Sequence, residues 1–484
     1  MLATPAMADA PPLQIPTVVH AHSTWSTGDQ SLEQLVSLAK ARGVRAVILT
    51  ENLLQQFEYG LPPLRSFLRH RVEYPSLLQK SPRKFLAAVR QANARQPDVL
   101  FIPGAETLPY YYWTGSLLGG TLTMHDGQKN ILVVGLQRPE DYQRLPVIGN
   151  PGAARWGWQS PVLLLLPVLL LSLGAWLFTH RRQRVVHFQR FRVVQRRRRV
   201  IPAFACSAAG IFFFLNNYPF QVQALSPYNA SQGVRPHQSV IDYVAQHGGL
   251  TVWSLPEARD YQVVQVAGLK ATIRTEPYAE DLLRTEGFTA FGGVYEDTTT
   301  FTNPGGGWDH LLLEYLAGRR KTPAWALGEA AYHREGQAGK RFGEVQTVIL
   351  ERRKDATSLL EAFKAGRMYA LRRTGEAGLA LDQFQVSASG EAAAEAGGRL
   401  TARRGSLPLV RAVVRATTSA PMQVEVRLMR SGATVHSVKG ETPLTITWQD
   451  AALQPSGRTY YRLEVQGPGG HQILSNPIFV TMDK

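Results

Sequence analysis

Two long apolar stretches in the middle of the chain constrain its fold more than any other feature. Residues 161–179 contain no charged side chain, and their length is close to the ~20 residues that a helix needs to cross a bilayer. Residues 200–220 are also apolar and rich in small side chains, which let two helices pack closely in lipid. Pro202 is unfavourable inside a helix and weakens the prediction of a second membrane span. A buried helix of a soluble core is therefore the alternative for residues 200–220. We expect a transmembrane hairpin over residues 156–220, with interfacial aromatic side chains at Trp156, Trp158 and Tyr218.

The segment between the two stretches carries much of the basic charge of the chain. The formal net charge is +16, and residues 180–199 hold nine arginines and no acidic residue. The positive-inside rule therefore places this loop in the cytoplasm and both long flanking segments outside the cell membrane. We expect the loop to contact anionic lipid headgroups. The lipid bilayer is the expected partner, and no nucleic acid is expected.

The start of the chain and its cysteine content are compatible with export. Residues 1–14 resemble the small-residue end of a signal peptide, without the basic and apolar regions that would precede it. We expect these residues to be a signal-peptide remnant. The single cysteine, Cys206, lies in the second apolar stretch, so an intramolecular disulfide is excluded.

The last quarter of the chain has a different pattern of apolar and polar residues from the part before it. Beyond residue 374, short segments of alternating polarity are separated by turn residues. Seven strands are expected at residues 379–386, 409–416, 422–429, 434–439, 444–448, 459–466 and 472–480. A flexible loop is expected at residues 388–398, which are rich in Ala, Gly and Glu. This count and spacing predict an immunoglobulin-like sandwich over residues 374–484.

Two histidines follow the first predicted strand of the amino-terminal part. In Val18-Val19-His20-Ala21-His22 the imidazoles are two residues apart, so on a strand they project to the same face and can seat one metal ion. The residues after them predict a helix over 31–42 and a strand over 46–50. His20 and His22 therefore lie at the exit of the first strand of a strand, helix, strand unit.

Five further motifs follow this pair in a particular order. They are Thr50-Glu51-Asn52, Gly104-Ala105-Glu106, Asn130-Ile131-Leu132-Val133-Val134-Gly135, Ser254-Leu255-Pro256 and Ala330-Ala331-Tyr332-His333. This order resembles the PHP family, the polymerase and histidinol phosphatase metallohydrolases, and in particular its membrane-associated or secreted phosphoesterase-like members. The resemblance covers residues 15–373. It implies an α/β fold, a distorted barrel of about seven βα units, in two parts (15–150 and 221–373) on either side of the hairpin.

The resemblance also implies a metal site. It makes His20, His22 and Glu106 ligands, with Glu106 also acting in catalysis, and this 2-His-1-carboxylate set is enough for one ion with open positions. His333 is implied as a fourth ligand or as the proton donor to a leaving group. The resemblance leaves Glu51 as a candidate for a further oxygen donor to the ion. Asn52, Asn130, Leu255 and Ala331 occupy positions where the family places ligands, so a site for three ions is not expected.

Two further features near these motifs can be interpreted from the sequence. The aromatic run 110–113 after Glu106 forms either a wall over a substrate or a loop buried against the core. Asp309 is predicted as the N-cap of a helix over residues 311–317.

Two functions remain open from the sequence. In the first, one Zn, Mn or Fe ion lowers the pKa of a bound water toward ~7, and the resulting hydroxide attacks a phosphate ester. The protein is then a metal-dependent phosphoesterase held at the outer membrane face. In the second, catalysis is lost, no metal is held, the remaining histidines are structural relics, and the PHP-like domain is a binding or scaffolding module. The expected ligand is a phosphate ester or a glycan. Metal content separates the two.

Overall fold

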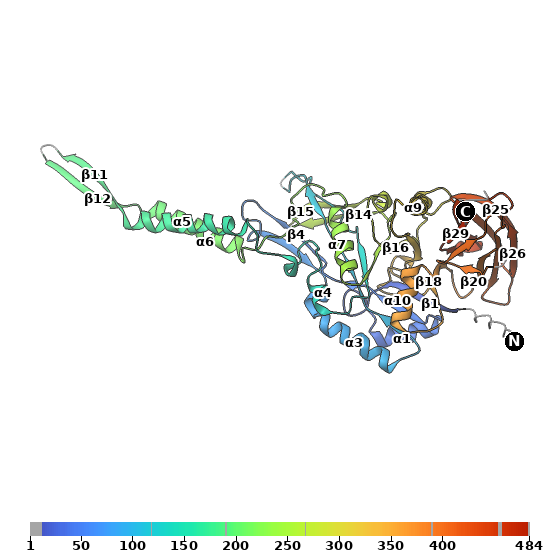
Figure 1. Ribbon diagram of the computed structural model, residues 1–484. Helices are drawn as coiled ribbons and strands as arrows, with labels where there is room; N and C mark the ends of the chain where they lie inside the picture. Colours follow the sequence, from blue (N-terminus) through green and yellow to red (C-terminus); the bar gives the residue numbers. More distant parts are fainter. Residues whose placement is uncertain are drawn as a thin grey trace, which may run out of the picture.

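A long arm leaves the body of the molecule and sets its shape (Figure 1). The structure, a computed structural model, describes residues 12–117, 119–188, 191–266, 268–388, 391–453 and 457–482. The expected signal-peptide remnant, residues 1–14, falls mostly outside the described residues, which begin at residue 12.

The first core sheet is built around the strand that carries His20. Its strands are, in order, β19 (Met368–Arg372), β18 (Val345–Glu351), β1 (Leu13–Ala21), β2 (Ala46–Leu49) and β6 (Leu100–Ile102). β1, β2 and β6 are parallel, whereas β18 pairs with β1 in the antiparallel sense. The predicted strand, helix, strand unit is present, because α1 (Leu32–Ala41) connects β1 to β2 and begins with a capping box at Ser31.

A second core sheet continues from the first. Its strands are, in order, β17 (Trp325–Gly328), β16 (Ala290–Val294), β13 (Leu250–Trp253), β10 (Ile131–Val134), β7 (Gly104–Thr107) and β3 (Glu51–Asn52). The chain passes almost directly from β2 into β3 and from β6 into β7. Beyond β17, Ala330 N donates to Val19 O, and Ala21 pairs with Tyr332. The strand ends therefore converge at the exit of β1.

Helices pack against both sheets and bury their apolar faces in a common core. They are α1, α2 (Leu77–Lys80), α3 (Pro82–Arg95), α4 (Pro139–Gln143), α7 (Arg235–Gln246), α8 (Ala279–Leu283), α9 (Gly307–Leu316) and α10 (Ala356–Ala365). Phe85 of α3, Val240 of α7 and Leu359 of α10 are fully buried in this core. The α/β class predicted for this part of the chain is confirmed.

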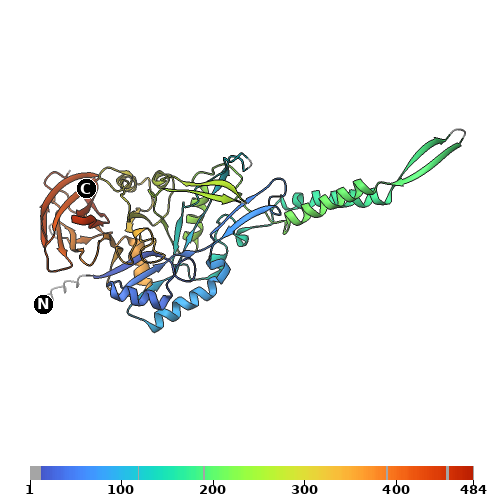
Figure 2. The ribbon, with the colours of Figure 1, turned by 180° about the vertical axis from the view of Figure 1, so that it is seen from behind.

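Smaller strand groups lie on the side of the body nearest the arm (Figures 1 and 2). One is the hairpin of β4 (Gln56–Gly60) and β5 (Arg69–Glu73). The other is a sheet in the order β14 (Asp260–Val266), β15 (Leu269–Thr275), β9 (Thr123–His125) and β8 (Tyr112–Thr114). Of the aromatic run after Glu106, Tyr110 and Tyr111 are buried.

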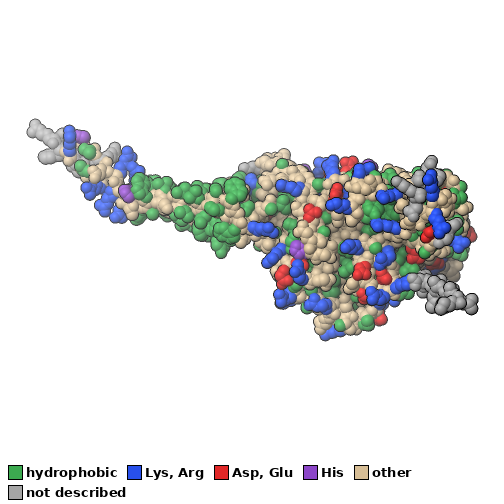
Figure 3. Space-filling model, in the orientation of Figure 1, with side chains coloured by type: hydrophobic (Ala, Val, Ile, Leu, Met, Phe, Trp, Pro, Cys, Tyr) green, Lys and Arg blue, Asp and Glu red, His purple; other side chains and the backbone are tan. Residues whose placement is uncertain are grey.

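The arm consists of two antiparallel helices and a strand hairpin beyond them. Helices α5 (Ser160–Thr179) and α6 (Val200–Asn217) are long and apolar enough to cross a membrane by length and composition. They pack through small residues, since Gly174 lies against Ala203 and Ser207, and Gly210 against Leu171. Most of their remaining surface is exposed and apolar (Figure 3).

The arginine-rich segment between these helices was expected to be a loop. Instead β11 (Arg181–Phe188) and β12 (Phe191–Arg198) pair as an antiparallel hairpin, and residues 189 and 190 of the predicted loop lie outside the described residues. The segment contains two Val-Val pairs, Val185-Val186 and Val193-Val194, and β-branched residues favour strands.

The carboxyl-terminal part forms two sheets around a second core. One sheet has the order β21 (Ala394–Glu395), β20 (Leu379–Ser387), β23 (Leu409–Ala416) and β26 (Leu444–Gln449). The other contains β22 (Arg399–Ala402), β24 (Gln423–Arg430), β25 (Ala433–Glu441), β27 (Gly457–Gln466), β28 (Gln472–Ser475) and β29 (Ile478–Met482). This second sheet joins the first core sheet where β28 pairs with β19.

Each of the seven predicted strands has a counterpart here, and the short strands β21 and β22 were not predicted. The predicted strand 472–480 is divided into β28 and β29 at Asn476, whose buried side chain hydrogen-bonds Ala326 and Met368 of the core sheets. The predicted flexible loop 388–398 contains the short strand β21, with residues 389 and 390 outside the described residues.

Asp309 joins the two cores instead of capping a helix. The N-cap of α9 is Gly306, so the predicted N-cap was wrong. Asp309 is buried in the first turn, where its carboxylate accepts bidentate hydrogen bonds of 2.7 Å from Arg462 of β27 and another from Tyr460. Its charge is paired across the junction, as a buried carboxylate requires.

We expect Asp309→Ala to destabilise the protein by about 3–5 kcal/mol, because it leaves the buried Arg462 guanidinium without its partner. Thermal unfolding of the purified protein measures this effect. Asp382→Ala, which removes an exposed ion pair with Arg415, is the control and should cost less than about 1 kcal/mol. Equal stability of the two variants would contradict the role of Asp309.

Candidate metal centre

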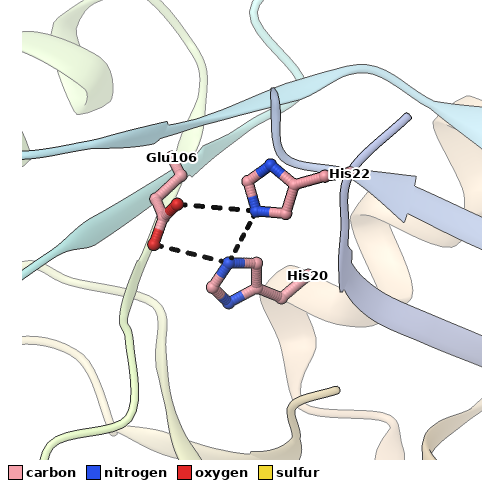
Figure 4. Close-up of side chains that lie close together, drawn as sticks. All are labelled: His20, His22 and Glu106. Atoms are coloured by element: carbon pink, nitrogen blue, oxygen red, sulfur yellow. Dashed lines mark hydrogen bonds and ion pairs between the residues drawn. The ribbon is translucent and has the colours of Figure 1, made fainter. Parts of the chain in front are cut away.

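Three candidate ligands meet where β1 and β7 end (Figure 4). His20 and His22 approach each other at Nε2 with a separation of 3.1 Å. The Glu106 carboxylate faces both, with Oε1 3.4 Å from His20 Nε2 and Oε2 3.5 Å from His22 Nε2. All the ligand atoms of this group lie within 4.8 Å of one another. Two imidazole nitrogens and a carboxylate oxygen that converge in this way fit one divalent transition-metal ion.

The backbone of β1 changes direction at His20. The register of β1 against β2 shifts between Val19 and Ala21, and His20 has a φ of 68°. Side-chain-bearing residues seldom adopt this left-handed conformation, and bulges of this kind re-aim side chains beside functional sites. The irregularity is held by the main-chain hydrogen bonds that join β1 to residues 330–332.

A buried carboxylate orients His20 from behind. Glu329 Oε1 lies 2.6 Å from His20 Nδ1, and Glu329 is fully buried. The same carboxylate accepts hydrogen bonds from Ser254 Oγ at 2.5 Å and from Leu255 N at 2.9 Å. Because Nδ1 donates to Glu329, Nε2 is the nitrogen that faces Glu106 and could bind a cation, which is the arrangement of metal-binding histidines backed by a carboxylate. Glu329 was not predicted as a site residue.

His22 is oriented by a serine and a second glutamate. Ser26 Oγ lies 3.1 Å from His22 Nδ1 and donates to Glu51 Oε2 at 2.5 Å. Glu51 Oε1 accepts from Ser23 Oγ at 2.5 Å and from Ser23 N at 3.0 Å. Glu51 was expected as an oxygen donor to the ion, but it lies outside the converging group and fixes the 23–26 loop that supports His22.

His333 lies beside the group and packs on His22. The two rings are stacked with centroids 4.0 Å apart and planes 8° apart. His333 Nδ1 is 2.9 Å from Thr27 Oγ1, which accepts a hydrogen bond from Asn52 Nδ2. The structure therefore brings His333 to the site, outside the three converging residues.

The positions at which the sequence resemblance implied further ligands line the same cavity. This cavity has a volume of about 450 Å³, and its walls include His20, Glu106 and His333. The substituted positions in its wall are Asn52, Asn130, Leu255 and Ala331. Asn130 donates a hydrogen bond of 2.7 Å to Glu106 Oε1. Leu255 and Ala331 offer no side-chain ligand atom.

Burial and the two carboxylates set the charges of the group. Burial lowers the pKa of His20, but Glu106 and Glu329 outweigh it and raise the value to about 9. Burial alone would raise the pKa of Glu106, but His20 and the other imidazoles hold it well below its usual range. Burial and the neighbouring His333 lower the pKa of His22. A proton on His20 thus balances the carboxylates, and a bound cation would take its place.

Burial is also the main influence on the pKa values of His333 and Glu51, which lie outside the group of three. It lowers the pKa of His333 to about 4 and raises that of Glu51 to about 7, against the hydrogen bonds from Ser23 and Ser26. His333 is therefore neutral near pH 7.

Comparisons with known proteins found similar solved structures. No family model and no curated protein matches the sequence. A Bacteroides vulgatus structure, described as a two-domain protein with a predicted PHP-like metal-dependent phosphoesterase, is 10% identical over 93% of this chain and 90% of its own, with a TM-score of 0.36. A Bifidobacterium adolescentis structure, described as a metal-dependent phosphoesterase, is 12% identical over 73% and 97%, with a TM-score of 0.28.

A third solved structure that matches is described as an amidohydrolase from Chromobacterium violaceum with bound sulfate and no metal. It is 12% identical over 67% of this chain and 90% of its own, with a TM-score of 0.28. All three matches have low identity and low TM-scores, so we base the function on the geometry of the site.

We expect Glu329→Gln to weaken metal binding by about 10–100-fold, because it removes the charge that orients His20. Titration of metal-free protein with Zn²⁺ against a fluorescent chelator measures the affinity. Glu361→Gln, on the exposed side of α10, is the matched control. Unchanged affinity in Glu329→Gln would show that this carboxylate does not support the site.

The raised pKa of His20 makes metal binding depend on pH. Its proton must leave when a cation binds, so the affinity for Mn²⁺ should rise between pH 7 and 9 by up to ~tenfold per pH unit. In the metal-free protein the same proton stabilises the fold fully below about pH 6.5, and this contribution is lost as the pH rises through about 9. Calorimetric titrations across this range measure the affinity, and a flat profile would contradict the account.

Proposed function

We propose that the chain is a membrane-tethered, metal-dependent phosphoesterase-type hydrolase with a single-ion site. The observation that supports this most is the convergence of His20, His22 and Glu106 on the wall of a cavity, with Glu329 behind His20. When bound, a Zn, Mn or Fe ion supplies Lewis acidity and a water acidic enough to act as hydroxide near pH 7.

The residues of the chain hold the ion and position the ester. His20, His22 and Glu106 are the proposed ligands. His333 is neutral near pH 7, and its Nε2 makes no hydrogen bond within the described residues, so we favour its role as a fourth ligand over that of a proton donor. Lys340 lines the cavity and pairs with Glu296 at 2.5 Å, which places an ammonium group where it can face a phosphate.

A binding module without turnover is the second candidate function. Leu255 and Ala331, at two family ligand positions, favour it, because their side chains cannot hold an ion. In that case the cavity binds a phosphate ester or glycan, and the histidines shape its wall.

We also propose the finer architecture that the motifs imply. The continuity of β2 with β3 and of β6 with β7, and the bridge from Ala21 to Tyr332, support a distorted seven-stranded barrel. Its parts would be residues 15–150 and 221–373, with the inserted hairpin at 156–220. The two sheets around the second core support an immunoglobulin-like sandwich over residues 374–484.

The arm supports the membrane tether. Helices α5 and α6 project from the body, and their apolar surfaces are exposed, whereas a core helix would be covered (Figure 3). Trp156, Trp158 and Tyr218 are 64%, 81% and 68% exposed at the body end of the arm, where an interfacial aromatic belt would lie. The arginines lie at the opposite end. We infer a cytoplasmic β11–β12 hairpin and an extracytoplasmic body.

We expect Glu106→Gln to reduce hydrolysis of an aryl phosphate by at least about 100-fold, because it removes the charged ligand. Turnover by purified protein supplied with Zn²⁺ or Mn²⁺ is the measurement, and Glu140→Gln, in an exposed ion pair with Arg83, is the control. Activity that survives Glu106→Gln would contradict the enzyme proposal. Tight ligand binding by the unaltered protein without turnover would favour the binding module.

Cysteine labelling on intact cells tests the sidedness. In a Cys206→Ser background, Ser231→Cys on the body should react with a membrane-impermeant thiol reagent, because Ser231 is exposed. Gln183→Cys in β11 should react only after the cells are permeabilised. Labelling of position 183 from outside would reverse the proposed topology.

A further inference from the structure

A second cavity beside the metal centre exposes more apolar than polar surface, although polar side chains also line it. It lies between the β4–β5 hairpin and the β14–β15 pair and has a volume of about 150 Å³. Its apolar lining includes Phe57, Tyr59, Trp113, Met124, Val264 and Ile273. An apolar cavity of this size holds about one benzene ring. The cavity therefore suits an aryl ring or a short alkyl segment.

The apolar cavity and the metal cavity share part of their walls. Gln55, Gln128 and Asp260 line both. Within the described part of the chain, the side-chain amides of Gln55 and Gln128 make no hydrogen bond, so both are free to face a bound molecule. One oxygen of Asp260, Oδ2, is buried and has no partner among the described residues. Polar groups thus stand at the boundary between a metal-binding compartment and an apolar one.

The hairpin that walls the apolar cavity also contacts the arm. At its tip, Ser66 N and Phe67 N donate hydrogen bonds of 2.9 and 3.2 Å to Asn216 Oδ1 near the body end of α6. The ring of Phe67 packs against Phe212 of α6 with centroids 5.5 Å apart. Leu61 and Leu68 are 44% and 47% exposed at the same tip. The apolar wall of the cavity is therefore continuous with the proposed membrane-facing end of the body.

We propose that the substrate of the metal centre is an amphipathic phosphate ester. Its phosphate lies in the cavity of His20, His22 and Glu106, and its apolar group fills the cavity under the β4–β5 hairpin. The hairpin leads from that cavity toward the bilayer, so the alkyl chain of a longer substrate would extend in that direction. This inference rests on the proposed function for the reacting group, but the apolar cavity binds its ligand by a separate interaction.

Binding of non-hydrolysable alkylphosphonates to Mn²⁺-loaded protein in nanodiscs tests this proposal. Burial of one CH₂ group is worth up to ~fourfold in affinity, so butylphosphonate should bind at least ~tenfold more tightly than methylphosphonate. In Val264→Asp, which places a charge in the apolar cavity, the difference should fall below ~twofold. Val263→Asp is the matched control, because Val263 is 51% exposed on the same strand and is not part of the cavity lining.

The outcomes separate this inference from the proposed function. Equal affinities of the two phosphonates for the unaltered protein, or a chain-length effect that Val264→Asp leaves intact, would overturn the apolar site. A chain-length effect that Val264→Asp removes, without turnover of any phosphate ester, would support the apolar site and overturn only the hydrolase. Dodecylphosphonate supplied in the nanodisc lipid distinguishes the source of the ligand. Tighter binding than butylphosphonate supports a lipid, and equal binding supports a soluble ester.

Discussion

The contact between Glu329 and His20 is the interaction on which the rest of the site depends. A fully buried carboxylate is costly unless it is paired, and Glu329 is paired with the His20 imidazole and with donors from Ser254 and Leu255. These partners come from the ends of β1 and β13, while Glu329 follows β17. The same interaction therefore fixes the tautomer of His20 and holds together the strand ends where the cavity opens.

The structure brings together His20, His22 and Glu106, which the sequence singled out, and gives Glu329 and Glu51 contacts that the sequence did not indicate. His20, His22 and Glu106 could be found because each lies in a short motif at the exit of a predicted strand. The role of Glu329 could not, since it depends on which strand ends meet, and that follows from long-range pairing such as Ala330 with Val19. Glu51 was expected to bind the ion because its motif matches, but the nearby Ser23 and Ser26 engage both of its oxygens.

In the fold, too, features that depend on a continuous stretch of sequence were predicted, whereas contacts between distant residues were not. Length and the absence of charge identified α5 and α6, because both are properties of a continuous stretch. The β11–β12 hairpin was missed, since the segment was interpreted from its charge and not from the strand preference of its two Val-Val pairs. Asp309 was misread as an N-cap, because its true partner, Arg462, is distant in the sequence and comes from the carboxyl-terminal sheets.

The central claim is that His20, His22 and Glu106 hold one metal ion. The most direct test is the metal content of the purified, detergent-solubilised protein by inductively coupled plasma mass spectrometry, beside a His20→Ala, His22→Ala double variant. The account predicts one equivalent of a transition metal per chain and its loss in the double variant. Metal no higher than the background of that variant, after supply of Zn and Mn, would contradict it.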